Sequence, residues 1–193
     1  TGDLYFATTN KGKVESALRS LGEQFRMVQI DNLDIKEEQQ KVQEIASHKA
    51  RVSYALLCKP VIVDDSGFVI PVQNGYPGTR VGRELKEKGL EHFLQIARND
   101  PRGYVDAYWE MTVGYFDDTL AKPQLFTSKV EGRLIGERRG EAKEFAKSPL
   151  AYAFVVNGFP QNKTIAEMTE EEYKQYATTD RWKALAEFLQ SRK

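Results

Sequence analysis

The stretch VIVDDSGFVIPVQNGYPGTR, residues Val61–Arg80, places two adjacent carboxylates directly after an apolar run. The β-branched residues of Val61–Val63 are typical of a central strand. A turn rich in glycine and proline follows downstream. Carboxylates at the end of a buried strand are costly unless a cation or hydrogen bonds compensate them. The sequence therefore raises the question of what neutralises Asp64 and Asp65.

The composition is that of an ordinary globular protein. The chain has 193 residues, of which 40% are hydrophobic and 29% are charged, and this length predicts one domain that covers residues 1–193. Twenty-eight Lys and Arg residues balance 28 Asp and Glu residues, so the net charge is zero. No global field then attracts a nucleic-acid polymer or an anionic membrane, and we expect neither as a partner.

The sequence also predicts a cytoplasmic location. No apolar stretch reaches the roughly 18 residues that span a bilayer, and the first residues lack a signal-peptide pattern. The single cysteine, Cys58, excludes an internal disulfide, and we expect it to be a packed side chain at the apolar end of a helix. Only two histidines are present, so carboxylates and lysines must carry any chemistry.

Strands alternate with helices along the first half of the chain, and a long antiparallel hairpin is expected in the middle. This order predicts a mixed β-sheet covered by helices. The expected strands are Asp3–Ala7, Phe25–Ile30, one or two within Val61–Arg80, the hairpin Gly103–Phe116 with Gln124–Gly136, and Leu150–Val156; the expected helices are Lys11–Gly22, Val42–Leu57, a segment around Leu90–Ala97, and one through Trp182 and Leu189.

Lys11 and Lys13 fall in the first turn of the first expected helix, where the helix dipole disfavours cations. A strand-to-helix loop with free N–H groups, the polar side chains of Thr8, Thr9 and Asn10, and two amino groups is suited to a phosphate. The alternative is that Thr9 or Asn10 caps the helix and the lysines are solvated. These residues alone do not decide between the two.

Lys49 stands seven residues after Val42 and so should lie on the apolar stripe of its helix. It either extends its amino group into solvent or reaches a second phosphate. Glu37 and Glu38 precede this helix in a loop, and such a pair is usually a solvated acidic turn.

For Asp64 and Asp65, a hard divalent cation is one solution, and few histidines with several carboxylates suit Mg²⁺. The alternative is a turn in which one aspartate accepts hydrogen bonds from backbone N–H groups. Together with the two lysine sites, metal plus polyphosphate is favoured because each feature supplies the partner that another lacks.

In these motifs the sequence resembles the inosine/xanthosine triphosphate pyrophosphatases, and the resemblance runs nearly end to end. FATTNKGKV is similar to the family's opening motif, which falls on Thr8, Asn10 and Lys13. LDIKEEQQKVQEIASHKA is similar to the second block, with Glu37 as the metal-site glutamate and Lys49 as the phosphate lysine. VDDSGFVIPVQNGYPGTR is similar to the block of the catalytic aspartate, here Asp65. GERRG, KTIAEMTEEE and DRWKAL are similar to the later motifs.

The resemblance implies a two-lobed α/β fold with a long mixed sheet flanked by helices and a central cleft, in a homodimer. It implies Mg²⁺-dependent hydrolysis of non-standard purine nucleoside triphosphates, such as ITP, dITP and XTP, to the monophosphate and pyrophosphate. Asp65 and Lys49 are then catalytic, Glu37 and Asp65 hold the metal, and Asp64 is a further metal ligand. Thr8, Asn10, Lys13 and the region of Ser66 bind the triphosphate.

The base pocket departs from the family pattern. Where the family has Phe-Gly-Trp/Tyr-Asp-Pro, the chain reads LAYAF, which keeps an aromatic side chain at Tyr152 and has Ala153 in the place of the aspartate. Where the family has Ser-His-Arg, the chain reads Thr179, Asp180 and Arg181. One hypothesis is that Asp180 replaces the missing carboxylate, and another is that the preferred base differs, including a pyrimidine or another modified base.

A base-contacting lysine is expected at Lys163 or Lys174, and a length difference prevents a choice between them. The alternative from another class is a non-catalytic nucleotide-binding protein that keeps the phosphate site. The residues that we expect to bind substrate are therefore Thr8, Asn10, Lys13, Ser66, Tyr152, Lys163, Thr179, Asp180 and Arg181.

Overall fold

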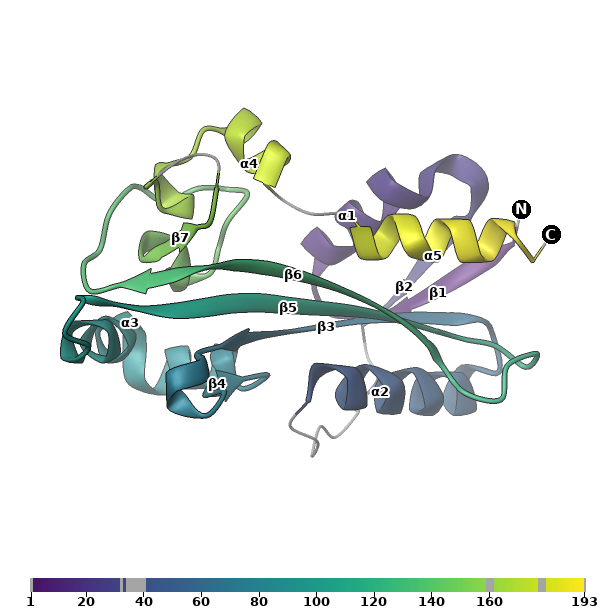
Figure 1. The fold of residues 1–193 in the computed structure, drawn as a ribbon. Coiled ribbons are helices and arrows are strands. Elements are labelled where there is room, and N and C mark those ends of the chain that lie inside the picture. The colour runs from purple at the N-terminus through teal and green to yellow at the C-terminus, as the bar shows by residue number, and fades with distance from the viewer. Residues whose placement is uncertain (1, 32, 34–40, 159–161, 177–179, 193) are drawn as a thin grey trace. The chain divides into compact units, whose positions relative to one another are not determined.

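The computed structural model describes residues 2–31, 33, 41–158, 162–176 and 180–192. Strands and helices alternate in the first half, and two long strands follow each other in the middle (Figure 1). The strands are β1 (Asp3–Ala7), β2 (Arg26–Ile30), β3 (Val61–Val69), β4 (Pro77–Gly78), β5 (Tyr104–Phe116), β6 (Gln124–Ile135) and β7 (Phe154–Val156); the α-helices are α1 (Lys11–Leu21), α2 (Val42–Leu57), α3 (Val81–Asn99), α4 (Glu170–Tyr176) and α5 (Asp180–Gln190).

The strands form one mixed sheet, as the sequence predicts. Within the described residues the strand order is β2-β1-β3-β5-β6-β7, and β4 pairs with β3. β1 is parallel to both β2 and β3, whereas β4 and β7 are antiparallel to their neighbours. Parallel neighbours need helical crossovers, and α1 and α2 are these crossovers.

The chain divides into two compact units, with the boundaries inside β3, β5 and β6. The first unit contains residues 1–66, 111–128 and 179–193, and the second contains residues 67–110 and 129–178. Each is described by itself below.

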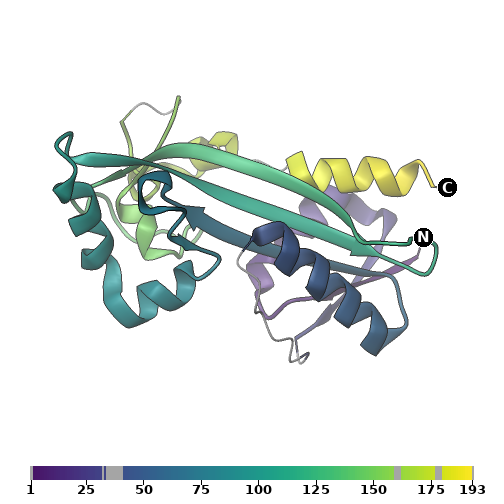
Figure 2. The same ribbon diagram turned by 60° about the horizontal axis from the view of Figure 1, so that its bottom comes forward.

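In the first unit, helices cover both faces of the sheet. α1 and α5 lie on one face and α2 lies on the other (Figures 1 and 2). Leu4, Phe6 and Ile62 pack with α1 and α5, and the ring of Trp182 in α5 lies 5.7 Å from that of Phe6. Val63, the next residue of β3, packs instead with α2. Successive strand residues point to opposite faces, so β3 contributes to both cores.

The close approach of α2 to the sheet depends on Gly114 of β5. A Cβ atom at this position would lie 3.1 Å from Val63 Cγ2, 3.2 Å from Leu125 Cδ2 and 3.4 Å from the carbonyl oxygen of Ala46 in α2. A glycine there lets α2, which carries Lys49, pack closely on β3 and β5.

The second unit has its own aromatic core. Phe68 packs against Trp109 at 5.0 Å and against Phe154 at 5.5 Å between ring centroids. Gly132 of β6 is needed here, because a Cβ atom would collide with the Phe154 ring and the carbonyl oxygen of Val155.

Several details differ from the expectations. The strand predicted at Leu150–Val156 begins only at Phe154, because Ser148 and Pro149 start a short 3₁₀ helix over Pro149–Tyr152. The helix expected around Leu90–Ala97 begins earlier, as α3, and its two halves meet at Gly89, which has a φ of 76°. Cys58 is exposed rather than packed, since it lies in the left-handed position that ends α2.

None of the described helices is long and apolar enough to cross a membrane.

Candidate functional site

The predicted phosphate-site residues gather at the carboxyl end of β1, next to β3. From β1 the chain crosses to β2 through α1, and it then crosses to β3 on the other side of β1 through α2. Ligands of open α/β sheets bind where neighbouring crossovers diverge in this way, outside the carboxyl ends of the strands. β1 ends at Ala7, whereas β3 runs from Val61 to Val69, so Asp64 and Asp65 lie in the middle of the strand, where the sequence predicts them at its end.

The two aspartates continue the alternation of β3. Asp64 follows Ile62 by two residues and so belongs to the face of α1 and α5, while Asp65 follows Val63 by two residues and belongs to the face of α2. Both residues are buried, with exposed fractions of 4% and 8%. The adjacent carboxylates therefore meet different helices, and each has its own cations.

Asp65 is paired with Lys49 of α2. Lys49 Nζ lies 3.7 Å from Asp65 Oδ1, and the two side chains are 19% and 12% exposed. The amino group is thus directed to Asp65 in the middle of β3 and not only into solvent. The role of Lys49 as a phosphate-binding lysine stays a prediction, and its amino group lies beside the acidic pair.

Asp64 is flanked by two cations from two different helices. Its Oδ2 lies 4.0 Å from Lys13 Nζ of α1 and 3.9 Å from Arg181 Nη2 of α5. Lys13 Nζ also donates a hydrogen bond of 3.2 Å to the Asp64 carbonyl oxygen. The Asp64 side chain is only 3% exposed, so water screens these attractions weakly. The attraction to the Asp64 carboxylate offsets the unfavourable interaction of the Lys13 cation with the helix dipole in the first turn of α1.

Asn10 caps α1, as one of the two alternatives predicts. Its side-chain oxygen accepts hydrogen bonds from the backbone N–H groups of Gly12 and Lys13, at 2.9 and 3.4 Å. Thr8 Oγ1 accepts from the Asn10 N–H at 3.1 Å. The two lysines differ in position, since Lys11 is exposed whereas Lys13 points towards β3. Asn10 therefore caps α1 while Lys13 lies beside the acidic pair.

The donor set of this site fits Mg²⁺ in its chemistry. Asp65 offers hard carboxylate oxygens, and Asp64 Oδ1 is buried and accepts no hydrogen bond from the described residues. Within the described part of the chain, no three His, Cys, Asp or Glu side chains gather in a group that could hold a metal ion. Glu37, which we expect to be a metal ligand, lies outside the described residues. Mg²⁺ is usually bound by one or two carboxylates together with substrate phosphates, which suits this sparse set.

The expected base-pocket residues of the second unit already interact with protein groups. The Arg138 guanidinium lies 3.8 Å above the Tyr152 ring, and Ala153 is fully buried beside it. Lys163 Nζ donates to both oxygens of Glu172, at 2.9 and 3.1 Å. A hydrogen bond from the Thr169 N–H and, after it, the one from Lys163 lower the pKa of the Glu172 carboxyl.

The other predicted residues have less distinctive positions. Lys174 is exposed and pairs with Glu170 on the same helix, at 3.3 Å. Ser66 follows the acidic pair in β3 and is half-buried. Asp180 is the exposed first residue of α5, and Thr179 lies outside the described residues.

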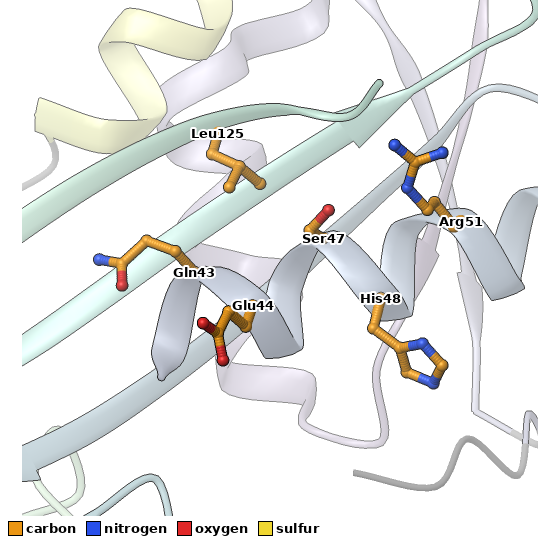
Figure 3. A pocket seen from close by; sticks show the side chains of 6 residues that line it. All are labelled: Gln43, Glu44, Ser47, His48, Arg51 and Leu125. Atoms are coloured by element: carbon orange, nitrogen blue, oxygen red, sulfur yellow. The ribbon is translucent and has the colours of Figure 1, made fainter. Parts of the chain in front are cut away.

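A separate depression of about 470 Å³ lies along α2, where Gln43, Ser47 and Arg51 line the side next to Leu125 of β6 (Figure 3). None of the predicted site residues lines it. It is bounded by α2 and Leu125 of β6, and it is distinct from the cluster around Asp64 and Asp65.

Comparison with known proteins shows the family of the chain. A sequence model of the Ham1 family matches residues 4–191. The chain belongs to the Ham1 family. A relative from Methanopyrus kandleri named dITP/XTP pyrophosphatase is 33% identical to this Ham1-family chain over 188 residues, which cover 97% of the chain and 94% of the relative. The inosine triphosphate pyrophosphatase of Aspergillus oryzae is 29% identical over 185 residues, which cover 96% and 91% of the two chains.

Solved structures support the fold of the Ham1-family chain. The Ham1 protein of Staphylococcus aureus superposes with a TM-score of 0.84 at 21% identity, and the match covers 99% of this chain and 100% of that protein. A HAM1 protein from Coxiella burnetii superposes equally well at 20% identity. The α/β fold with a mixed sheet, predicted from the sequence, is confirmed.

Sequence reasoning did not foresee the contact between Arg181 and Asp64. The signal that could have revealed part of it is the two-residue period of β3, which places adjacent aspartates on opposite faces. The pairing of Lys163 with Glu172 and the stacking of Arg138 on Tyr152 have no such signal, because both depend on how separate segments fold together.

Proposed function

We propose that this Ham1-family protein is a nucleoside triphosphate pyrophosphatase that hydrolyses non-standard purine nucleotides to the monophosphate and pyrophosphate. The names of the relatives support the enzyme class and the substrate class. The single observation that carries the proposal is the cluster around Asp64 and Asp65 of β3, beside the carboxyl end of β1. There, amino groups from α1 and α2 converge on two adjacent carboxylates.

The residues of this cluster suit attack on a phosphoanhydride. In this proposal Asp65 accepts a hydrogen bond from the attacking water and directs it at the α-phosphorus. Lys13 and Lys49 donate to oxygens of the departing pyrophosphate, whose negative charge grows as the bond breaks. Thr8, Asn10 and the region of Ser66 contribute hydrogen-bond donors at the triphosphate.

Magnesium is part of the proposal. Asp65 and Glu37 would hold it, with Asp64 as the further candidate that the sequence suggests. Bound Mg²⁺ supplies a Lewis acid that neutralises phosphate oxygens. The homodimer and the role in clearing damaged nucleotides from the cytoplasm also belong to the proposal, and sedimentation velocity tests the first of these.

Base selectivity is the least constrained part of the proposal. Ala153 stands where the resemblance predicts a carboxylate, and this neutral, buried side chain supports the alternative of an altered base preference. A site built on buried hydrogen bonds discriminates strongly, so the loss of one polar partner changes which base fits.

The experiment is a pyrophosphate-release assay over ITP, dITP, XTP, dUTP and the four common ribonucleoside triphosphates, with and without Mg²⁺. We expect the 6-oxopurine substrates to be hydrolysed only when Mg²⁺ is present. Asp65→Asn should abolish this turnover while the variant keeps the circular dichroism spectrum of the wild type. A preference for a pyrimidine or for ATP would favour the altered-specificity alternative. Nucleotide binding without release of pyrophosphate from any substrate would contradict an enzymatic role.

A further inference from the structure

A guanidinium group stacks on the aromatic ring of the expected base pocket. Arg138 Cζ lies 3.8 Å from the centre of the Tyr152 ring, which is van der Waals contact with the ring face and closer than the 4.7 Å between Arg102 and Tyr104. We infer that Arg138 is a specificity-determining residue, whose guanidinium, held on Tyr152, donates to the O6 and N7 acceptors of a 6-oxopurine. This inference rests on the function proposed above.

Backbone hydrogen bonds hold the segment around Arg138 against Tyr152. The next residue, Arg139, donates from its N–H to the Tyr152 carbonyl oxygen at 2.8 Å. Three residues before Arg138, the Ile135 N–H donates to the Ala153 carbonyl oxygen at 2.9 Å. The backbone on both sides of Arg138 is thus tied to the residues that carry the ring, although the Arg138 side chain itself is exposed.

The two neighbouring arginines differ in what they bind. Arg139 Nη2 donates to the Asn162 carbonyl oxygen at 2.5 Å, and Arg139 Nε lies 3.1 Å from Glu167 Oε1, so protein groups already engage this side chain. Among the described residues, Arg138 forms no ion pair with a carboxylate and donates no hydrogen bond. The N–H donors of Arg138 lie in one plane on the ring and are available to a ligand.

The edge of a 6-oxopurine matches these donors. A guanidinium binds O6 and N7 of such a base with two parallel hydrogen bonds, whereas adenine has an amino donor in the place of O6. The fully buried side chain of Ala153 is a methyl group, which neither accepts nor donates a hydrogen bond. Arg138 therefore gives the pocket a polar group that the resemblance does not predict. Inosine, xanthosine and guanosine nucleotides share the O6 and N7 edge, so Arg138 does not select among them.

The first experiment compares ITP with ATP. Arg138→Lys keeps the positive charge but has neither the planar stack nor the parallel donors. We expect this variant to lower the ratio of kcat/KM for ITP to kcat/KM for ATP by about 10-fold or more, through a loss for ITP. Lys147→Gln removes an 81% exposed cation from the same connection and should change the ratio by less than about twofold. An unchanged ratio in Arg138→Lys, or an equal loss for both nucleotides, would overturn the assignment.

Two further measurements test the atoms involved. 7-Deaza-ITP lacks the N7 acceptor, so the wild type should have a kcat/KM for it that is at least about fivefold lower than for ITP, and Arg138→Lys should treat the two alike within about twofold. An equal penalty in both proteins would contradict the contact with N7. In a double-mutant cycle, Arg138→Lys should change the ITP-to-ATP ratio less than half as much, in logarithmic terms, in a Tyr152→Leu background. Additive effects would refute the role of the stack.

Calorimetric titration with IMP and AMP gives a readout without turnover. We expect the wild type to bind IMP at least about fivefold more tightly than AMP, and Arg138→Lys to lose this preference. If the wild type hydrolyses no nucleotide but shows this behaviour, the proposed function fails and the assignment of Arg138 stands. Equal binding of IMP and AMP by the wild type, or an unchanged preference in Arg138→Lys, would refute the assignment even where ITP is hydrolysed.

Discussion

Asp117→Asn should destabilise the first unit, because Asp117 joins the hairpin between β5 and β6 to the end of α5. Its carboxylate accepts hydrogen bonds from Tyr115 Oη at 2.7 Å, from Thr119 Oγ1 and N at 2.6 and 3.0 Å, and from Arg192 Nη2 at 3.1 Å. The residue is 7% exposed. The isosteric asparagine keeps an oxygen for Thr119 but places an NH₂ group against the donors of Tyr115 and Arg192.

The expected loss follows from the two bonds to Oδ2. A hydrogen bond to a charged, buried acceptor contributes roughly 1.5–3 kcal/mol, and this value applies to Tyr115. Arg192 is 29% exposed, so its ion pair is discounted to about 1 kcal/mol or less. We therefore expect Asp117→Asn to lower the free energy of unfolding by about 2–4 kcal/mol. Asp118→Asn, a substitution of the exposed neighbour, should cost less than about 0.5 kcal/mol.

The effect should depend on pH. Burial raises the pKa of the Asp117 carboxyl, but the hydrogen bonds from Thr119 and Tyr115 and the charge of Arg192 outweigh it, so the pKa lies below its ordinary value. A lowered pKa contributes stability that is present above the pKa of the unfolded chain, about 3.9, and is lost as the pH falls through the folded value. The difference between the wild type and Asp117→Asn should thus be constant above about pH 5 and shrink below about pH 4.

Urea unfolding, followed by the fluorescence of Trp182 in the core of the same unit, measures this difference. Trp109→Phe as a common background removes the signal of the second unit. A loss under 0.5 kcal/mol at pH 7, or a difference that is the same at pH 7 and pH 3, would refute the reasoning.

Two further predictions concern the position and the charge of α2. Lys49→Gln should lower kcat/KM by about 10²- to 10³-fold, because it removes a preorganised cation beside Asp65. Lys41→Gln, at the exposed start of the same helix, should have little effect. Steady-state kinetics with ITP measures both variants, and near-normal turnover of Lys49→Gln would contradict the assignment. Gly114→Val should lower the free energy of unfolding in urea by about 1–3 kcal/mol, because the new side chain would press on Val63, Leu125 and the Ala46 carbonyl. An unchanged unfolding midpoint would show that α2 does not pack as described.

Much of the fold could be predicted from local patterns. The α2 helix has the predicted bounds, Val42–Leu57, because its apolar stripe and the absence of glycine and proline agree with each other. The start of α3 was missed because Gly82 and Gly89 interrupt the helical pattern, and the first half of the helix is held by tertiary contacts. Among these, Tyr76 Oη donates to Glu84 Oε2 at 2.6 Å, and the Tyr76 hydroxyl also lies 2.9 Å from His92 Nε2 in the second half.

The site could be predicted only in part. Three sites could be identified because each has a charge in an unfavourable position: the lysines of the opening loop at a helix start, Lys49 on an apolar helix face and the acidic pair in a buried strand. Which cation meets which aspartate depends on the faces of the sheet that α1, α2 and α5 cover, and no local pattern encodes that choice. For the same reason, the sequence did not reveal that Arg181, which the resemblance assigns to the base, lies 3.9 Å from Asp64.

The central claim is that the cluster around Asp64 and Asp65 of β3 directs water at the α-phosphorus of a nucleoside triphosphate. The most direct measurement is phosphorus NMR of the products formed from ITP and Mg²⁺ in oxygen-18-labelled water. The account predicts IMP and pyrophosphate, with the label in the phosphate of IMP. Formation of IDP and inorganic phosphate, or label in pyrophosphate with none in IMP, would contradict it.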